Sequence, residues 1–187
     1  MFSKVTSIKT SKKISIFVYE WLDALMVALV FVILLFVFVF KTYMVRGPSM
    51  IPTLVEGNRV YVICAFYKPS QGDVVIMDEK LQLGDSIIKR VIAVEGQQVN
   101  IDSQTGEITV DGVVFINPVP TSTKNIVSNS SMTYPVVVPK GYIFVMGDNR
   151  GNSLDSRSDK VGFIDVRDVI GKALYVISPV DQFRKIR

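Results

Sequence analysis

The longest apolar run in the chain covers residues 24–40 and is built from Val, Phe, Leu, Ile, Met and Ala. As an α-helix it measures about 26 Å, close to the roughly 30 Å of a bilayer's hydrocarbon core. Trp21 and Tyr43 flank it with aromatic rings suited to a membrane interface. A core helix would carry polar residues on one face, and a cleaved leader would end in small residues, and neither pattern is present. The pattern therefore predicts an uncleaved transmembrane anchor at residues 21–40.

Residues 1–20 are polar and carry four lysines, Lys4, Lys9, Lys12 and Lys13. Lysine-rich short segments stay in the cytoplasm, so residues 1–20 are expected there and residues 41–187 on the extracytoplasmic side. Lys41, Arg46 and Arg59 follow the anchor and reduce the charge difference across it.

Beyond the anchor, short Val- and Ile-rich segments alternate with Gly and Pro, a pattern typical of strands. The expected strands are residues 59–64, 73–77, 87–94, 97–102, 142–146 and 169–177. Asp111-Gly112 between residues 108–110 and 113–115 predicts a hairpin with a type I′ turn. Residues 118–131 are polar and predict a long surface loop. The fold class is mostly β, with antiparallel sheets behind one N-terminal transmembrane helix.

Composition excludes several kinds of chemistry. The chain has no histidine, so a Ser-His-Asp triad and imidazole metal sites are impossible. Its one cysteine, Cys64, allows no internal disulfide and lies in a strand-like apolar segment. The net charge of +4 includes no dense basic stripe, which argues against nucleic acid as a partner. No metal and no cofactor are expected.

A candidate nucleophile lies just after the anchor, in residues 47–53 (GPSMIPT). Gly47, Pro48 and Pro52 impose an irregular backbone that suits neither a helix nor a central strand. Ser49 between the prolines is either part of a structural bend or a nucleophile.

Without histidine, a serine nucleophile needs another base, and lysine is the usual substitute. An ordinary lysine has a pKa of about 10.4, and desolvation among apolar groups can lower it by roughly three units. Lys89 lies inside the strand-like segment 87–94 and shares one face with Ile87 and Val91. The alternative is an edge lysine that discourages sheet aggregation.

A third unusual segment, residues 147–157, places turn formers between carboxylates and guanidiniums. Asp148 and Asp155 could pair with Arg150 and Arg157 and fix this loop, whereas the simpler interpretation is an exposed loop. A carboxylate metal site is disfavoured because the arginines compete for the acids.

Taken in order, residues 47–53, the strand beginning Gly72-Asp73-Val74-Val75, residues 89–93 and residues 147–157 resemble the sequence boxes of bacterial type I signal peptidases. The single anchor and short length are similar to the compact Gram-positive form. The resemblance implies a Ser–Lys endopeptidase that removes signal peptides from exported preproteins after small residues, at Ala-x-Ala sites.

By position in those boxes, the resemblance makes Ser49 the nucleophile and Lys89 the general base, with Ser153 orienting the Lys89 amine. It makes four further residues structural: Arg90, Asp148, Asp155 and Arg157.

The resemblance also places an extended substrate beside residues 43–49 and 85–89. The residues implied in substrate binding are Tyr43, Val45, Met50, Ile87 and Ile88. Some relatives carry a serine two residues before the nucleophile, where its hydroxyl assists the oxyanion hole. Gly47 occupies that position here, so a compensating donor is expected.

The implied partners are signal-peptide-bearing preproteins, membrane lipid and the secretion translocon, with no nucleic acid. Two alternatives stay open at this point. One is a self-cleaving Ser–Lys protease of the repressor type, although such proteins are soluble and carry a nucleic-acid-binding domain. The other is a non-catalytic anchored β-domain that binds export partners or peptides, in which Ser49 and Lys89 are structural. A Lys89 amine far from the Ser49 hydroxyl would favour it, and a distance near 3 Å would favour the enzyme.

Overall fold

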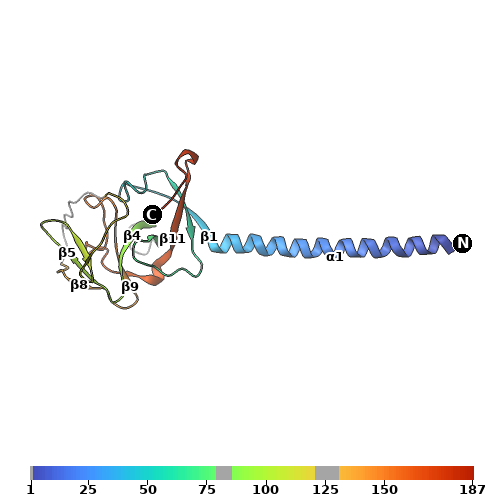
Figure 1. Ribbon diagram of the computed structural model, residues 1–187, viewed down its shortest axis with the longest axis horizontal. Helices are drawn as coiled ribbons and strands as arrows, with labels where there is room; N and C mark the ends of the chain where they lie inside the picture. Colours follow the sequence, from blue (N-terminus) through green and yellow to red (C-terminus); the bar gives the residue numbers. More distant parts are fainter. Residues whose placement is uncertain (1, 79–85, 121–130) are drawn as a thin grey trace. The chain divides into compact units, whose positions relative to one another are not determined.

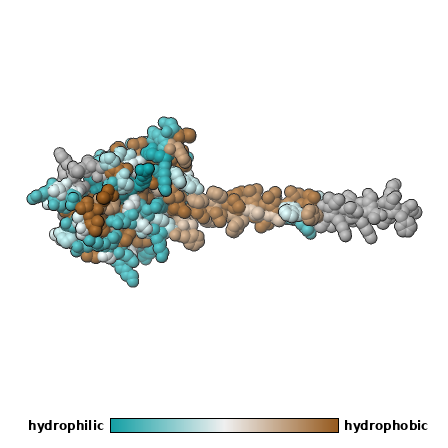
Figure 2. Space-filling view, viewed as in Figure 1, coloured by the Kyte–Doolittle hydropathy of each residue, from teal (hydrophilic) through white to brown (hydrophobic). Residues whose placement is uncertain are grey.

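The computed structural model describes residues 2–78, 86–120 and 131–187, and the chain divides into two units, Met1–Val39 and Phe40–Arg187. The first unit is one helix, α1 (Phe2–Val39). Within the described residues, the stretch Phe17–Val39 is the one that is long and apolar enough to cross a membrane. Figure 2 shows apolar side chains along this stretch. The helix ends one residue earlier than the sequence pattern indicated, because Phe40 already belongs to a strand.

The second unit contains a large antiparallel sheet (Figure 1). Its strands run in the order β1 (Phe40–Met44), β2 (Arg59–Ile63), β11 (Val169–Ser178), β3 (Val74–Met77), β4 (Ile87–Val94), β9 (Tyr142–Met146) and β10 (Ile164–Asp165), with β12 (Arg184–Lys185) beside β11. Two short 3₁₀ helices, Val166–Asp168 and Val180–Gln182, flank β11.

A smaller antiparallel sheet follows the end of β4. Its order is β7 (Val113–Val114), β6 (Ile108–Val110), β5 (Gln98–Ile101) and β8 (Val136–Val137). Asp111 and Gly112 both have positive φ, 52° and 79°, so the predicted type I′ hairpin turn is confirmed. Figure 1 shows β5 and β8 on the side of this unit away from β1.

The mostly β, antiparallel fold class is confirmed, and all six expected single strands are present within a residue or two of their expected bounds. Of the predicted loop 118–131, residues 121–130 lie outside the described part of the chain.

One row of paired residues crosses the large sheet from its edge to its middle. Phe40 pairs with Ile63, Ile63 with Lys172, Lys172 with Val75, and Val75 with Lys89. Phe40 is the first residue after α1. The fold therefore places Lys89 in the same row as Phe40, the first residue of this unit, four strands away.

Candidate active site

Ser49 lies in the connection between β1 and β2. Hydrogen bonds from the loop after β9 hold the backbone of this connection. The carbonyl oxygen of Ser49 accepts a hydrogen bond from the Asn149 N–H at 2.9 Å. The Asn149 side-chain amide donates to the Pro48 carbonyl oxygen at 3.1 Å. Asn149 thus couples the nucleophile turn to the loop that follows β9, a role that the sequence did not indicate.

Lys89 projects from β4 toward Ser49, and its Nζ lies 2.8 Å from Ser49 Oγ. Its side chain is 4% exposed. The register pairs Ile87 with Met77 and Lys89 with Val75, and Ile87, Val91, Val75 and Met77 pack in one apolar cluster. Lys89 therefore does emerge on the face of Ile87 and Val91. The edge-lysine alternative does not fit, because Lys89 is buried and its amine bonds to Ser49 instead of facing solvent.

Burial among these apolar groups lowers the pKa of Lys89 to about 8. The carboxylate of Asp155 opposes this shift of the pKa, and the guanidinium of Arg157 adds to it. About a tenth of the amine is then neutral at pH 7. A neutral amine at hydrogen-bond distance can take the proton of the Ser49 hydroxyl, so the pair can act as nucleophile and general base.

Gly147, the residue directly after β9, leaves no space for a side chain next to Ser49 and Ser153. A Cβ at this position would lie 2.2 Å from Ser153 Oγ and 2.5 Å from the Ser49 carbonyl oxygen. No side chain fits there without displacing one of the two serines. The sequence showed this glycine within a motif, but gave no signal of the close approach.

Ser153 lies beside Gly147, with its Oγ shielded from solvent. Its hydroxyl is near enough to Asp155 to help lower the pKa of that carboxyl, against the raising effect of burial. Within the described part of the chain, however, Ser153 Oγ has no hydrogen-bond partner. Its orienting action on the Lys89 amine stays a prediction.

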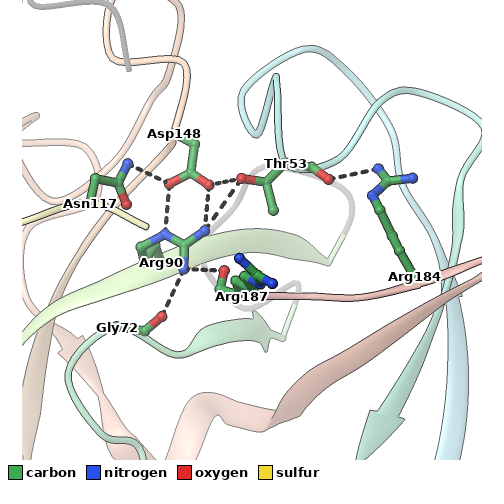
Figure 3. A network of polar contacts seen from close by, with 7 residues as sticks. All are labelled: Thr53, Gly72, Arg90, Asn117, Asp148, Arg184 and Arg187. Carbon is green, nitrogen blue, oxygen red and sulfur yellow. Dashed lines mark hydrogen bonds and ion pairs between the residues drawn. The ribbon is translucent and has the colours of Figure 1, made fainter. Parts of the chain in front are cut away.

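Arg90, the residue after Lys89, is fully buried and connects four segments (Figure 3). Its Nε and Nη2 donate to the two carboxylate oxygens of Asp148 at 2.8 and 2.6 Å. Its Nη1 donates to the backbone oxygens of Gly72 and Arg187 at 2.8 and 2.7 Å. The Thr53 hydroxyl, four residues after the nucleophile, donates to Asp148 as well. This network ties the strand of the base to the turn of the nucleophile.

A second ion pair fixes the loop after β9. Arg157 donates from Nε and Nη2 to the two oxygens of Asp155, both at 2.8 Å, and also from Nη2 to the Arg150 carbonyl oxygen at 2.8 Å. The predicted locking of this loop by paired hydrogen bonds is confirmed at Asp155, but Asp148 pairs with Arg90 rather than Arg150. Asp148, Asp155 and Arg157 are all buried, so the part of the loop that carries the ion pairs is not exposed, whereas residues 151, 152 and 154 are exposed.

Substitution of Asp148 by asparagine is expected to lower the free energy of unfolding by about 3 kcal/mol, because Arg90 would keep a buried charge without its counterion. Chemical denaturation of the two proteins measures this difference. Asp165→Asn is the matched control, since Asp165 pairs with Arg167, whose side chain is 87% exposed. Equal destabilisation by both substitutions would contradict the account of the Arg90 network.

Four of the residues implied in substrate binding lie in one apolar cluster, Tyr43, Val45, Met50 and Ile88. Ile87 packs in a different cluster, because alternate residues of β4 point to opposite faces of the sheet. Asp85, the first residue of the implied segment 85–89, lies outside the described residues.

One backbone edge of β4 is left uncovered at the start of the strand. In the described strands, β9 pairs with β4 from Arg90 onward, while Ile87 to Lys89 pair with β3 on the other side. The backbone of residues 87–89 therefore has an edge that β9 does not cover.

Among the described residues, no group of three or more acidic, cysteine or histidine side chains could hold a metal ion.

Comparison with known proteins gives one consistent result. Residues 18–178 match the family described as signal peptidase, peptidase S26. A signal peptidase I of Bacillus licheniformis is 34% identical over 94% of this chain and 96% of its own. A probable signal peptidase I-1 of Synechocystis sp. is 36% identical over 91% of this chain and 87% of its own.

The crystal structure of a signal peptidase I from Enterococcus faecalis shares 25% identity and aligns with a TM-score of 0.45, covering 58% of this chain and 98% of that one. The family match extends over most of the chain and includes both Ser49 and Lys89. This chain belongs to the signal peptidases of the peptidase S26 family.

Proposed function

We propose that this chain is a membrane-anchored serine endopeptidase that removes signal peptides from exported preproteins with a Ser49–Lys89 dyad. The observation that carries the proposal is the 2.8 Å distance between Lys89 Nζ and Ser49 Oγ, made by a lysine that is 4% exposed. The non-catalytic alternative would have gained from a long distance between these two side chains, so the distance of 2.8 Å favours the peptidase.

The proposed reaction has two steps. The neutral Lys89 amine takes the proton of the Ser49 hydroxyl as its oxygen attacks the scissile carbonyl carbon. When the C–N bond breaks, the new amino terminus of the mature protein takes that proton and leaves, and the signal peptide stays esterified to Ser49. Lys89 then deprotonates a water molecule, whose oxygen attacks the ester carbon. The bond from that carbon to Ser49 Oγ breaks, and Ser49 Oγ takes the proton back from Lys89 as the signal peptide leaves with a free carboxyl end. The Ser49 N–H makes no hydrogen bond within the described residues, which leaves it available to the oxyanion.

The substrate is proposed to bind as an extended strand along the uncovered backbone edge of residues 87–89. Val45, Met50 and Ile88 are 2%, 1% and 8% exposed, so a side chain that enters this apolar region finds little space. Shallow pockets of this kind admit alanine at the −1 and −3 positions of the substrate. Ile87 faces away from this cluster, and a role for it is limited to its backbone.

The location of the dyad fits a substrate that emerges from a membrane. The apolar helix together with the family assignment indicates membrane anchoring, and we propose residues 1–20 as the cytoplasmic tail, 21–40 as the anchor and 41–187 as the extracytoplasmic domain. Lys89 shares a row with Phe40 across four strand spacings, about 19 Å along the sheet. The dyad would then act near the bilayer surface, where the translocon delivers preproteins.

The rate of cleavage is expected to rise with pH and to reach half its plateau near pH 8. The reason is that the neutral form of Lys89 is the base, and burial lowers its pKa to about 8. Below that pH the amine is protonated and cannot accept the Ser49 proton. A profile of kcat/KM against pH for a preprotein measures this, and a rising limb centred near pH 10 would contradict a desolvated lysine base.

Specificity tests the proposed reaction. Purified full-length protein in detergent should cleave a labelled preprotein after an Ala-x-Ala site, and the new amino terminus of the product identifies the bond. Replacing the −1 alanine of that preprotein by phenylalanine should abolish cleavage, because the apolar cluster leaves no room for the ring. Equal cleavage of both preproteins would refute the proposed pockets.

A further inference from the structure

Arg150, in the loop after β9, has a buried guanidinium that no carboxylate neutralises in the described part of the chain. The residue is 4% exposed. Its backbone is fixed, because its N–H donates to the Asp148 carbonyl oxygen at 3.1 Å and its own carbonyl oxygen accepts from Arg157 at 2.8 Å. Its Nε has no hydrogen-bond partner among the described residues, and none of their ion pairs includes it.

Asp148, the nearer of the two buried carboxylates along the chain, is already saturated (Figure 3). Its two oxygens accept from Arg90 Nε and Nη2 at 2.8 and 2.6 Å. The Thr53 hydroxyl donates to it as well, and the Asn117 amide donates to it at 3.3 Å. A carboxylate offers about four acceptor positions, so Asp148 has none left for Arg150.

Asp155, the other buried carboxylate, is used to the same extent. Arg157 donates to it from Nε and Nη2, both at 2.8 Å, and from its backbone N–H at 3.3 Å. The Gly147 N–H donates to it at 2.9 Å. The three buried guanidiniums of this region, at positions 90, 150 and 157, thus face two carboxylates, and one positive charge is left over.

The excess charge belongs to Arg150. Burial lowers its pKa to about 10, and the Arg157 guanidinium adds to this effect, while Asp148 and Asp155 oppose it. The group is therefore still charged at neutral pH. A buried charge without a counterion is strongly destabilising.

The hydroxyl of Tyr134 is a second buried donor in this region. Burial raises its pKa to about 12, and the charges of Arg157 and Asp155 also act on it. Like Arg150 Nε, it has no hydrogen-bond partner among the described residues. Free buried donors together with an excess positive charge are what an anion requires of its site.

We infer that Arg150 forms a binding site for a small monovalent anion such as chloride. The ion would accept from Arg150 Nε and neutralise the excess charge of the buried network. The low exposure of Arg150 favours an ion of halide size over the carboxylate of a peptide. This site lies beyond the proposed peptidase reaction, because it would stabilise the loop that carries Ser153 and takes no part in the chemistry.

The test measures the unfolding temperature of the purified full-length protein in a nonionic detergent, without substrate, in sodium chloride and in sodium gluconate of equal ionic strength. Equal ionic strength cancels general screening, and gluconate is too large for a buried site. The parent protein should unfold about 4 °C higher in chloride once chloride exceeds its dissociation constant tenfold. Arg150→Met, which fills a similar volume without the charge, should show no difference between the two salts.

Arg167→Gln is the matched control, because Arg167 pairs with Asp165 and its side chain is 87% exposed. This variant should keep the full response to chloride. Equal unfolding temperatures of the parent in the two salts would overturn the inference, and so would a chloride response that persists in Arg150→Met.

A second measurement needs no variant to fold. The NMR signal of chloride broadens when the ion exchanges with a protein site, so the parent in gluconate is titrated with chloride and then with an excess of bromide. The site predicts broadening beyond that of detergent alone, reversed by bromide as a competing halide. No broadening beyond the detergent background would overturn the inference and leave the proposed peptidase reaction unaffected.

Discussion

Replacing Lys89 by methionine is expected to lower kcat/KM for preprotein cleavage by about 10⁴-fold or more. Methionine is similar in length and apolar, so it can occupy the buried site beside Val75 and Val91. The amine that lies 2.8 Å from Ser49 Oγ is lost, and no other group in the described part of the chain is paired with that hydroxyl. The substitution therefore removes the base and keeps the packing.

The measurement is the rate of preprotein cleavage by purified parent and variant proteins, with circular dichroism to confirm that both are folded. Lys140→Met is the matched control, because Lys140 is an exposed residue of the β8–β9 connection. It should cleave at the parent rate. A Lys89→Met protein that retains a tenth of the parent activity would show that another group acts as the base.

Replacing Gly147 by alanine is the second large effect that we expect, with kcat reduced by about 10²-fold. The added Cβ would overlap Ser153 Oγ at 2.2 Å and the Ser49 carbonyl oxygen at 2.5 Å. One of these groups must move by about 1 Å, and a displacement of that size between reacting groups costs about that factor in rate.

Gly171→Ala is the control for Gly147→Ala. A Cβ at Gly171 would lie 2.2 Å from the Ile63 carbonyl oxygen, an equally severe overlap that involves no residue of the dyad. Both variants should lose stability, but the Gly171 variant should keep the parent kcat per folded molecule. Loss of kcat to the same extent in both would mean that the Gly147 effect is general destabilisation.

The longer strands could be predicted because the two-residue alternation of their side chains is visible within a few consecutive residues of the sequence. Alternation along residues 87–94 placed Lys89 on the face of Ile87 and Val91, and the register with β3 agrees. The Asp111-Gly112 pair was sufficient to predict its turn, because these residue types favour the positive φ angles that both residues adopt. By contrast β8, β10 and β12 have two residues each, too few for any period to be visible. β1 was missed because Phe40 prolongs the apolar run of the helix.

The polar side of the site could be predicted in part. Residue types in the loop after β9 indicated arginine–carboxylate pairing, and the local pair Asp155–Arg157 is two residues apart. The pair Arg90–Asp148 joins residues 58 positions apart, and its choice over Arg150 depends on how β4 and β9 align. The contacts of Thr53, Asn149 and Gly147 arise in the same way, from tertiary structure.

The most direct test of the central claim compares the purified full-length protein with its Ser49→Ala variant on one labelled preprotein in detergent. The dyad predicts release of the mature protein by the parent and none by the variant, because Ser49 Oγ is the atom that forms the acyl bond. Processing by the Ser49→Ala protein at the parent rate would contradict it.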